Sequence, residues 1–204
     1  AQMNRTTVAL MFASCTLLAA PAAAQSGFSV LGGFVSASVS YEFEDGDMAD
    51  DIASRTGFAI GVGLNRAGAG AISFAPELLY VVKGANDDDS DFFTKQSYLE
   101  VPLLFRYSFR GSGSATPYVT AGPTIGFLAS CSAGDEDGSE KCDDFFGEDN
   151  SYKSLDYGLM AGVGINFGKF GVSARYEMGL ANITEESCCT EKNKALMVLG
   201  SVAF

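Results

Sequence analysis

Large hydrophobic residues alternate with small or polar residues along most of the chain after residue 25. The pattern is clearest over residues 98–109, where one face carries Leu99, Val101, Leu103, Phe105, Tyr107 and Phe109. A period of two residues predicts a β-strand, because successive side chains of a strand point to opposite faces. Seven further segments repeat the pattern, at roughly residues 28–41, 56–66, 70–82, 116–129, 154–167, 170–181 and 194–204. The chain is therefore predicted to be all-β, with about eight strands.

The second face of these strands is rich in glycine and other small residues, as in residues 56–66, where it carries Gly57, Ala59, Gly61 and Gly63. Small side chains suit the interior of a narrow closed barrel, while bulky apolar residues face lipid. We therefore expect a transmembrane up-and-down antiparallel β-barrel of about eight strands. The alternative is a soluble β-sandwich, in which the apolar faces pack inside and the polar faces meet water.

The same second face carries six ionisable residues, Glu77, Glu100, Arg106, Asp156, Arg175 and Glu177. In a small barrel they would face the lumen, where an unpaired charge is costly. We expect ion pairs and hydrogen bonds among them. Because the lumen of an eight-stranded barrel is usually filled, this network is interpreted as structural and not as catalytic or conducting.

The connections between the predicted strands differ in length in a regular order. Short links near residues 67–69, 110–115 and 168–169 alternate with long polar links near 42–55, 83–95, 130–153 and 182–193. Outer-membrane barrels combine short periplasmic turns with long external loops, and their strands need about 9 to 11 residues to cross the hydrocarbon layer. The pattern predicts that both ends of the mature chain lie in the periplasm.

The first 24 residues have the features of a secretory signal peptide. Arg5 precedes an apolar run over residues 8–20, and small residues follow at 22–24. We expect export and cleavage after Ala24, which leaves a barrel domain over residues 25–204. An ordinary buried helix and a lipoprotein modified at Cys15 are the alternatives.

Charge and composition narrow the function further. The 204 residues carry a formal net charge of −12 and contain no histidine. Binding to nucleic acid is not expected, because phosphate contacts need clustered Lys and Arg. Without histidine the Ser-His-Asp and Cys-His arrangements cannot form, so the protein is predicted not to be an enzyme and to have no cofactor.

The acidic residues gather in runs that raise a calcium hypothesis. Hard oxygen ligands are available from Asp87, Asp88, Asp89 and Asp91, or from Asp143, Asp144, Glu148 and Asp149. Neither run has the spacing of an EF-hand loop or an RTX repeat. Solvated loop acid is the preferred interpretation, so no metal site is predicted.

Apart from Cys15, the cysteines are Cys131, Cys142, Cys188 and Cys189, all in the third and fourth long loops. The oxidising periplasm favours disulfides, and four thiols allow three full pairings. A bridge between adjacent cysteines would be strained, so we favour bonds that tie Cys188 or Cys189 to Cys131 and Cys142. A zinc site is the alternative, but the spacing contains no C-x-x-C.

Several strand sequences resemble the PorT-like family of outer-membrane barrels and small eight-stranded barrels of the OmpA type. The matching stretches are SYLEVPLLFRY at 97–107, PYVTAGP at 117–123, GLMAGVG at 158–164 and RYEMGL at 175–180. The resemblance implies the barrel fold, and for PorT itself a role in a secretion assembly.

The chain ends with the alternating residues Leu196, Val198, Gly200, Val202 and Phe204. This ending resembles the signal that the barrel assembly machinery reads, with Phe204 last. An edge strand that merely ends in Phe is the alternative.

These observations predict a non-enzymatic outer-membrane β-barrel with a lumen filled by side chains. We expect a structural or surface-binding role through the acidic extracellular loops, with outer-membrane lipids and an unidentified extracellular ligand as partners. A secretion-assembly component and a narrow pore are the main alternatives, and a membrane enzyme is the least favoured.

Overall fold

The computed structural model describes residues 27–43, 48–49, 53–67, 71–86, 91–109, 115–135, 138–147, 152–184 and 189–204. Over these ranges the chain forms ten strands and one short helix. They are β1 (Gly27–Phe43), β2 (Met48–Ala49), β3 (Ala53–Ala67), β4 (Ile72–Asn86), β5 (Phe93–Ser108), β6 (Ala115–Asp135), β7 (Gly138–Lys141), α2 (Cys142–Phe146), β8 (Leu155–Phe167), β9 (Phe170–Gly179) and β10 (Cys189–Ala203).

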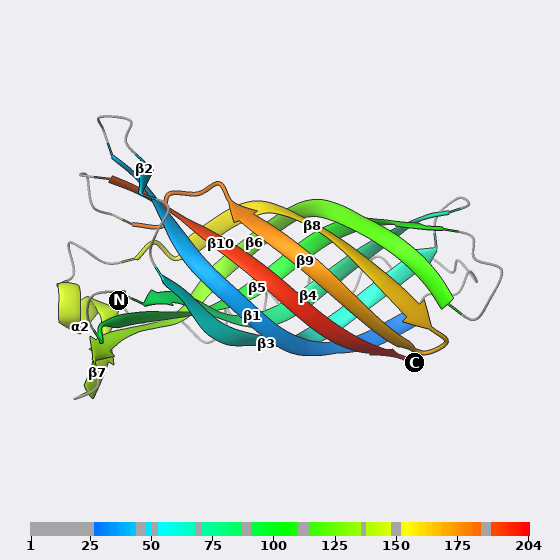
Figure 1. The fold of residues 1–204 in the computed structure, drawn as a ribbon, viewed down its shortest axis with the longest axis horizontal. Helices are drawn as coiled ribbons and strands as arrows, with labels where there is room; N and C mark the ends of the chain where they lie inside the picture. Colours follow the sequence, from blue (N-terminus) through cyan, green and yellow to red (C-terminus); the bar gives the residue numbers. More distant parts are fainter. Residues whose placement is uncertain are drawn as a thin grey trace, which may run out of the picture.

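Eight of these strands close into one antiparallel barrel (Figure 1). Each pairs with its neighbour in the order β10-β9-β8-β6-β5-β4-β3-β1, and β10 also pairs with β1 from Ser29↔Ala203 to Phe43↔Cys189. The last pairing removes both sheet edges, so the predicted eight-stranded barrel is confirmed and the two-sheet sandwich is excluded. The short strands β2 and β7 lie outside this ring of eight, where β2 pairs with β1 and β7 pairs with β6.

The register of the strands turns the large apolar residues outward. Phe34 is 74% exposed, and the same outward face carries exposed residues on every barrel strand, including Phe58, Leu78, Phe105, Phe127, Val163, Val172 and Val198. An apolar belt of this kind is stable only where it meets hydrocarbon. The alternation in the sequence therefore marks outside and inside as predicted for a transmembrane barrel.

The lumen contains both apolar and polar side chains. A buried apolar cluster is formed by Leu31, Val35, Ala37, Ala59, Leu79, Val81, Leu104, Met160, Ala195, Met197 and Leu199. Charged and amide side chains from several strands are buried with them. The inner face is thus packed, as the small circumference of eight strands requires.

The barrel has a long-loop end and a short-turn end. Figure 1 shows β2, β7 and α2 at the end opposite the carboxy terminus. Strands run further into this long-loop end than the sequence predicted: β4 continues to Asn86 and β5 begins at Phe93, so most of the expected loop 83–95 is strand. The prediction was wrong there because strand residues above the lipid layer need no outward apolar side chain.

Within the described ranges, no helix is long and apolar enough to cross a membrane. The expected signal peptide, residues 1–24, lies outside the described residues. Its removal and the assignment of the two barrel ends to the periplasm and the cell exterior stay predictions.

Candidate functional site

An ion pair between β4 and β9 crosses the lumen. Both terminal nitrogens of Arg175 donate to Glu77, from Nη1 to Oε2 at 2.5 Å and from Nη2 to Oε1 at 3.0 Å. The two side chains are 1% and 2% exposed. A paired, two-point contact of a guanidinium with a carboxylate is the strong form of such a bond, and it compensates much of the cost of burying both charges.

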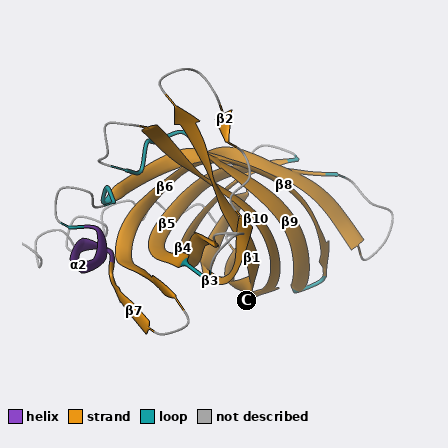
Figure 2. Cartoon of the chain, turned by 60° about the vertical axis from the view of Figure 1, so that its left-hand side comes forward, coloured by secondary structure: helices purple, strands orange, loops and turns teal. Residues whose placement is uncertain are grey.

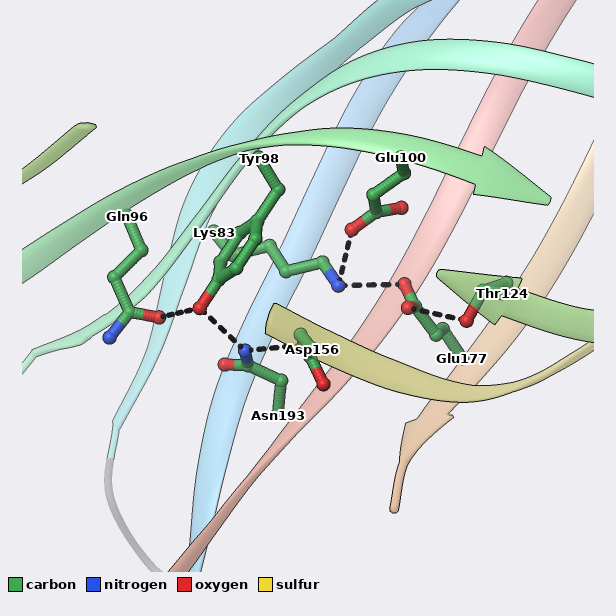
Figure 3. Close-up of polar contacts among 8 residues, drawn as sticks. All are labelled: Lys83, Gln96, Tyr98, Glu100, Thr124, Asp156, Glu177 and Asn193. Carbon is green, nitrogen blue, oxygen red and sulfur yellow. Dashed lines mark hydrogen bonds and ion pairs between the residues drawn. The ribbon is translucent and has the colours of Figure 1, made fainter. Parts of the chain in front are cut away.

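A second charged group lies closer to the long-loop end and centres on Lys83 (Figure 3). Its Nζ atom is 2.6 Å from Oε1 of Glu100 on β5 and 2.9 Å from Oε2 of Glu177 on β9. Thr124 on β6 donates its hydroxyl to the other oxygen of Glu177 at 3.2 Å. One buried ammonium thus holds two buried carboxylates that come from different sides of the barrel.

Amide and phenol groups continue this arrangement. The Nδ2 atom of Asn193 on β10 donates to Oδ2 of Asp156 at 2.9 Å and to the hydroxyl oxygen of Tyr98 at 3.3 Å. The hydroxyl of Tyr98 donates to Oε1 of Gln96 at 3.2 Å. Figure 3 shows these side chains pointing toward one another from β5, β8 and β10. We call the eight residues drawn there the lumen network: Lys83, Gln96, Tyr98, Glu100, Thr124, Asp156, Glu177 and Asn193.

Glycines in the wall make room for these large side chains. A Cβ atom on Gly162 would lie 2.8 Å from Cγ of Arg175 and 2.7 Å from the carbonyl oxygen of Ala174. A Cβ atom on Gly126 would meet Tyr98 and Glu100 at an ordinary 3.4 Å. The glycine-rich face predicted from the sequence therefore faces the lumen, and at Gly162 the space is needed by a specific side chain.

Arg106 does not form the ion pair that the sequence analysis expected. Its guanidinium carbon lies 4.2 Å from the ring centroid of Tyr118, and Nε has no hydrogen-bond partner in the described chain. Glu77, the nearby carboxylate, instead binds Arg175 through both of its oxygens. Arg106 is instead stabilised by the face of an aromatic ring.

The other five predicted residues are buried in the lumen but fall into two groups. Glu77 pairs with Arg175, whereas Glu100, Asp156 and Glu177 belong to the lumen network. Sequence reasoning missed Lys83, Gln96 and Asn193, because it placed Lys83 and Asn193 in two predicted loops and began the strand after Gln96. The available signal was the excess of predicted inward carboxylates over inward cations, which called for one more cation.

One disulfide joins Cys131 on β6 to Cys142 at the start of α2. This differs from the favoured pairing, which tied these two cysteines to Cys188 or Cys189. The hairpin between β6 and β7 brings Ser132 opposite Lys141, and this places the two cysteines next to each other with a Cα–Cα distance of 5.4 Å. Cys188 and the side chain of Cys189 lie outside the described residues.

Beyond the disulfide, β7 and α2 form an arm at the long-loop end, residues 138–147. Figure 2 shows the arm projecting from the barrel beside β6. Phe145 and Phe146 on α2 contact the ring of Phe92 from the β4–β5 connection, at centroid distances of 5.6 and 6.3 Å. Phe146 also contacts Tyr152. The arm is therefore fixed by one covalent bond and a set of aromatic contacts.

Two further predictions concern metal and the carboxy terminus. Of the calcium candidates, Asp143 and Asp144 are exposed on the arm, whereas Asp87–Asp89 and residues 148–149 lie outside the described residues. No cluster of three metal-ligating side chains occurs in the described part.

Phe204 is 73% exposed on the outward face and contacts the ring of Phe28. Its role as an assembly signal stays a prediction.

A closed barrel of eight antiparallel strands, with an apolar outer belt and a packed polar lumen, defines a small transmembrane barrel of the outer membrane. A family model described as outer membrane protein beta-barrel domain matches residues 9–185. The chain belongs to this family, and its location is the outer membrane. The match does not distinguish a PorT-like protein from other members, so that finer assignment stays a prediction.

The solved structures to which this chain is similar include three bacterial proteins. Neisserial surface protein A aligns with a TM-score of 0.49 and 13% identity, covering 88% of this chain and 100% of that chain. OprG from Pseudomonas aeruginosa gives 0.47 and 14%, with 88% and 96% covered. Ail of Yersinia pestis, crystallised with the heparin analogue sucrose octasulfate, gives 0.45 and 14%, with 89% and 100% covered. No curated protein matches the sequence significantly.

Proposed function

We propose that this protein is a non-enzymatic outer-membrane barrel. Its acidic loops lie above the membrane and bind a partner at the cell surface. In this proposal the lumen is closed, the long-loop end is extracellular and the short-turn end is periplasmic. This orientation follows the general design of outer-membrane barrels, which have short periplasmic turns.

The observation that carries the proposal is that lumen contacts join strands on opposite sides of the barrel. In a ring of eight strands, β4 and β9 are four strands apart in either direction, and so are β5 and β10. Glu77 binds Arg175 and Lys83 binds Glu177 across the first pair, while Tyr98 binds Asn193 across the second. These contacts span the diameter, so a continuous water path would require several buried contacts to break together.

The arm supports a binding role at the long-loop end. It is fixed by the disulfide and by its aromatic contacts, yet Phe145 remains 48% exposed and both Asp143 and Asp144 are exposed beside it. A rigid exposed aromatic residue with flanking charges is a typical anchor for a protein partner. The acidic character of the arm and the neighbouring loops favours a basic partner.

Conductance in planar bilayers tests the closed lumen. The purified protein, folded as shown by its heat-dependent gel mobility, is added to a bilayer under voltage. We expect no channel steps above those of protein-free detergent. Reproducible single-channel steps from the folded protein would instead favour the narrow pore.

Binding to a charged probe tests the acidic surface. Proteoliposomes are mixed with fluorescent oligolysine, and with oligoglutamate as the control of opposite charge. We expect binding of oligolysine that decreases with salt and that is weaker for the double variant Asp143→Asn/Asp144→Asn. Equal binding of both peptides would contradict the proposal, and stable membrane subunits that co-purify with the barrel would favour the secretion assembly.

A further inference from the structure

Arg106 carries a positive charge that is not paired with any carboxylate of the described chain. Its guanidinium carbon lies over the ring of Tyr118, and its Nε atom has no hydrogen-bond partner there. The charged side chains that act on Arg106 are Glu77 and Arg175, and these two form an ion pair with each other. The three groups together therefore keep one positive charge that is not compensated.

Arg55, near the start of β3 at the long-loop end, provides a comparison with Arg106. Its guanidinium carbon lies 4.4 Å from the ring centroid of Phe93, so its contact with an aromatic face is nearly the same. Its Nη1 atom also donates to Oδ1 of Asn86 at 2.9 Å. Both arginines are partly exposed. The two sites therefore differ in the hydrogen-bond acceptor and not in the aromatic contact.

Two hydroxyl residues lie directly opposite Arg106 on the neighbouring strands. The register pairs Arg106 with Ser73 on β4 and with Thr120 on β6, and residues paired in this way share a face of the sheet. Thr120 is 4% exposed, and its Oγ1 atom has no hydrogen-bond partner in the described chain. An unpaired buried hydroxyl costs free energy, and an unpaired guanidinium costs more. A ligand that accepts hydrogen bonds from both groups would remove both costs.

These residues lie near the short-turn mouth of the lumen. Ser73 is the second residue of β4, and Glu77 lies four residues further along the strand, about 13 Å towards the long-loop end. The ion pair of Glu77 with Arg175 therefore lies between this group and the lumen network. Because Ser73 and Arg106 are both partly exposed, a small solute can reach them.

We propose that Arg106, Thr120 and Ser73 bind one inorganic phosphate ion at the short-turn mouth of the lumen. The guanidinium supplies the positive charge and paired N–H donors, while the two hydroxyls donate to further oxygens of the ion. The ring of Tyr118 supports the guanidinium from its other side. The inference goes beyond the proposed function, because it concerns the end of the barrel opposite the acidic loops.

Phosphate is chosen over a carboxylate because of the arrangement of the donors. They come from the three adjacent strands β4, β5 and β6, with Arg106 in the middle. Donors that converge from three strands suit the tetrahedral oxygens of phosphate better than the two coplanar oxygens of a carboxylate. Chloride, which is a single atom, cannot use the paired N–H donors of a guanidinium in the same way.

Equilibrium dialysis of the folded protein in a zwitterionic detergent against radiolabelled phosphate tests the proposal, with sodium chloride keeping the ionic strength constant. We expect one phosphate per barrel, displaced by unlabelled phosphate but not by the same concentration of acetate. Arg106→Gln should weaken binding about 10- to 100-fold, the range for losing a hydrogen bond to a charged group. Thr120→Val removes the hydroxyl and keeps the shape of the side chain, so it should weaken binding about 2- to 10-fold.

Arg55→Gln is the matched control, because Arg55 makes the same kind of aromatic contact at the opposite end of the barrel. It should bind phosphate within about twofold of the wild type. Heat-dependent gel mobility shows whether each variant is folded, and Thr120→Val decides the outcome if Arg106→Gln does not fold.

Absence of phosphate binding by the wild type would overturn the proposal, as would unchanged binding by the folded variants of Arg106 and Thr120. An equal loss in Arg55→Gln would show that phosphate responds only to the overall charge, and displacement by acetate would assign the group to a carboxylate. Either result would overturn the phosphate site. The assay involves neither conductance nor a peptide partner, so its failure leaves the proposed loop function standing.

Discussion

The outer and inner faces of the barrel wall carry opposite kinds of side chain, and β9 shows this most simply. Its outward residues Tyr176 and Met178 are 47% and 43% exposed, whereas its inward residues Arg175 and Glu177 are 1% and 4% exposed. The charged groups are buried and the apolar groups are exposed because the outer solvent is hydrocarbon. Whether a residue stabilises this wall therefore depends on its face and not on its hydrophobicity alone.

The largest expected effect comes from removing the one cation of the lumen network. Lys83→Met leaves the carboxylates of Glu100 and Glu177 buried without their partner. Loss of one member of a buried ion pair costs about 3–5 kcal/mol in the free energy of unfolding. Urea unfolding in phosphatidylcholine vesicles, followed by gel mobility, measures the change.

The matched control is the same substitution on the other face. Lys95→Met lies on the adjacent strand with an exposed, outward side chain, so we expect a change below about 0.5 kcal/mol. Similar losses for the two variants would mean that the lumen charges do not stabilise the barrel, and the comparison between the faces would fail.

A charge placed on the outer face should be the next most costly change. Val163 is 59% exposed and lies well inside the span of β8, so Val163→Arg should cost about 2–4 kcal/mol in lipid vesicles. Val202→Arg, near the short-turn end of β10, should cost about 0–1 kcal/mol. Equal costs at the two depths would contradict the assignment of the apolar belt to the hydrocarbon layer.

A smaller effect is expected from filling the inner face. Gly162→Ala would force a methyl group against Arg175 and a backbone carbonyl, which should cost about 1–3 kcal/mol. Gly126→Ala, where the methyl group finds ordinary contacts, should cost less than about 1 kcal/mol. The same unfolding assay compares them, and a reversed order would show that the wall adjusts more easily at Gly162 than its contacts indicate.

The smallest effect on the barrel should follow from loss of the disulfide. Cys131→Ser/Cys142→Ser removes a bridge across 11 residues that is worth about 3 kcal/mol to the segment it closes. Because the arm lies outside the strand ring, we expect barrel unfolding to change by less than about 1 kcal/mol, while limited proteolysis cuts the arm faster. Faster unfolding of the whole barrel would show that the arm and the barrel are one cooperative unit.

The fold and the identity of the two faces were predictable from the sequence, since a period of two is a local property of each strand. Residues 98–108 on β5 and 170–179 on β9 show this directly. The ends of the strands were less predictable, as at Lys83, because the outward apolar signal disappears where a strand rises above the lipid.

By itself, the sequence determined the number of barrel strands and the orientation of each face, because the alternation is visible within each strand. It did not give the complete set of lumen residues, since Lys83, Gln96 and Asn193 were missed. Only the tertiary structure decided which inward charges meet. Glu77 finds Arg175 through the closure and stagger of eight strands, which set distances across the lumen, whereas Arg106 finds Tyr118 through the register of the adjacent strands β5 and β6. The pairing of Cys131 with Cys142 likewise depended on the β6–β7 hairpin. Contacts between strands come from the geometry of the whole ring, and no single segment contains that information.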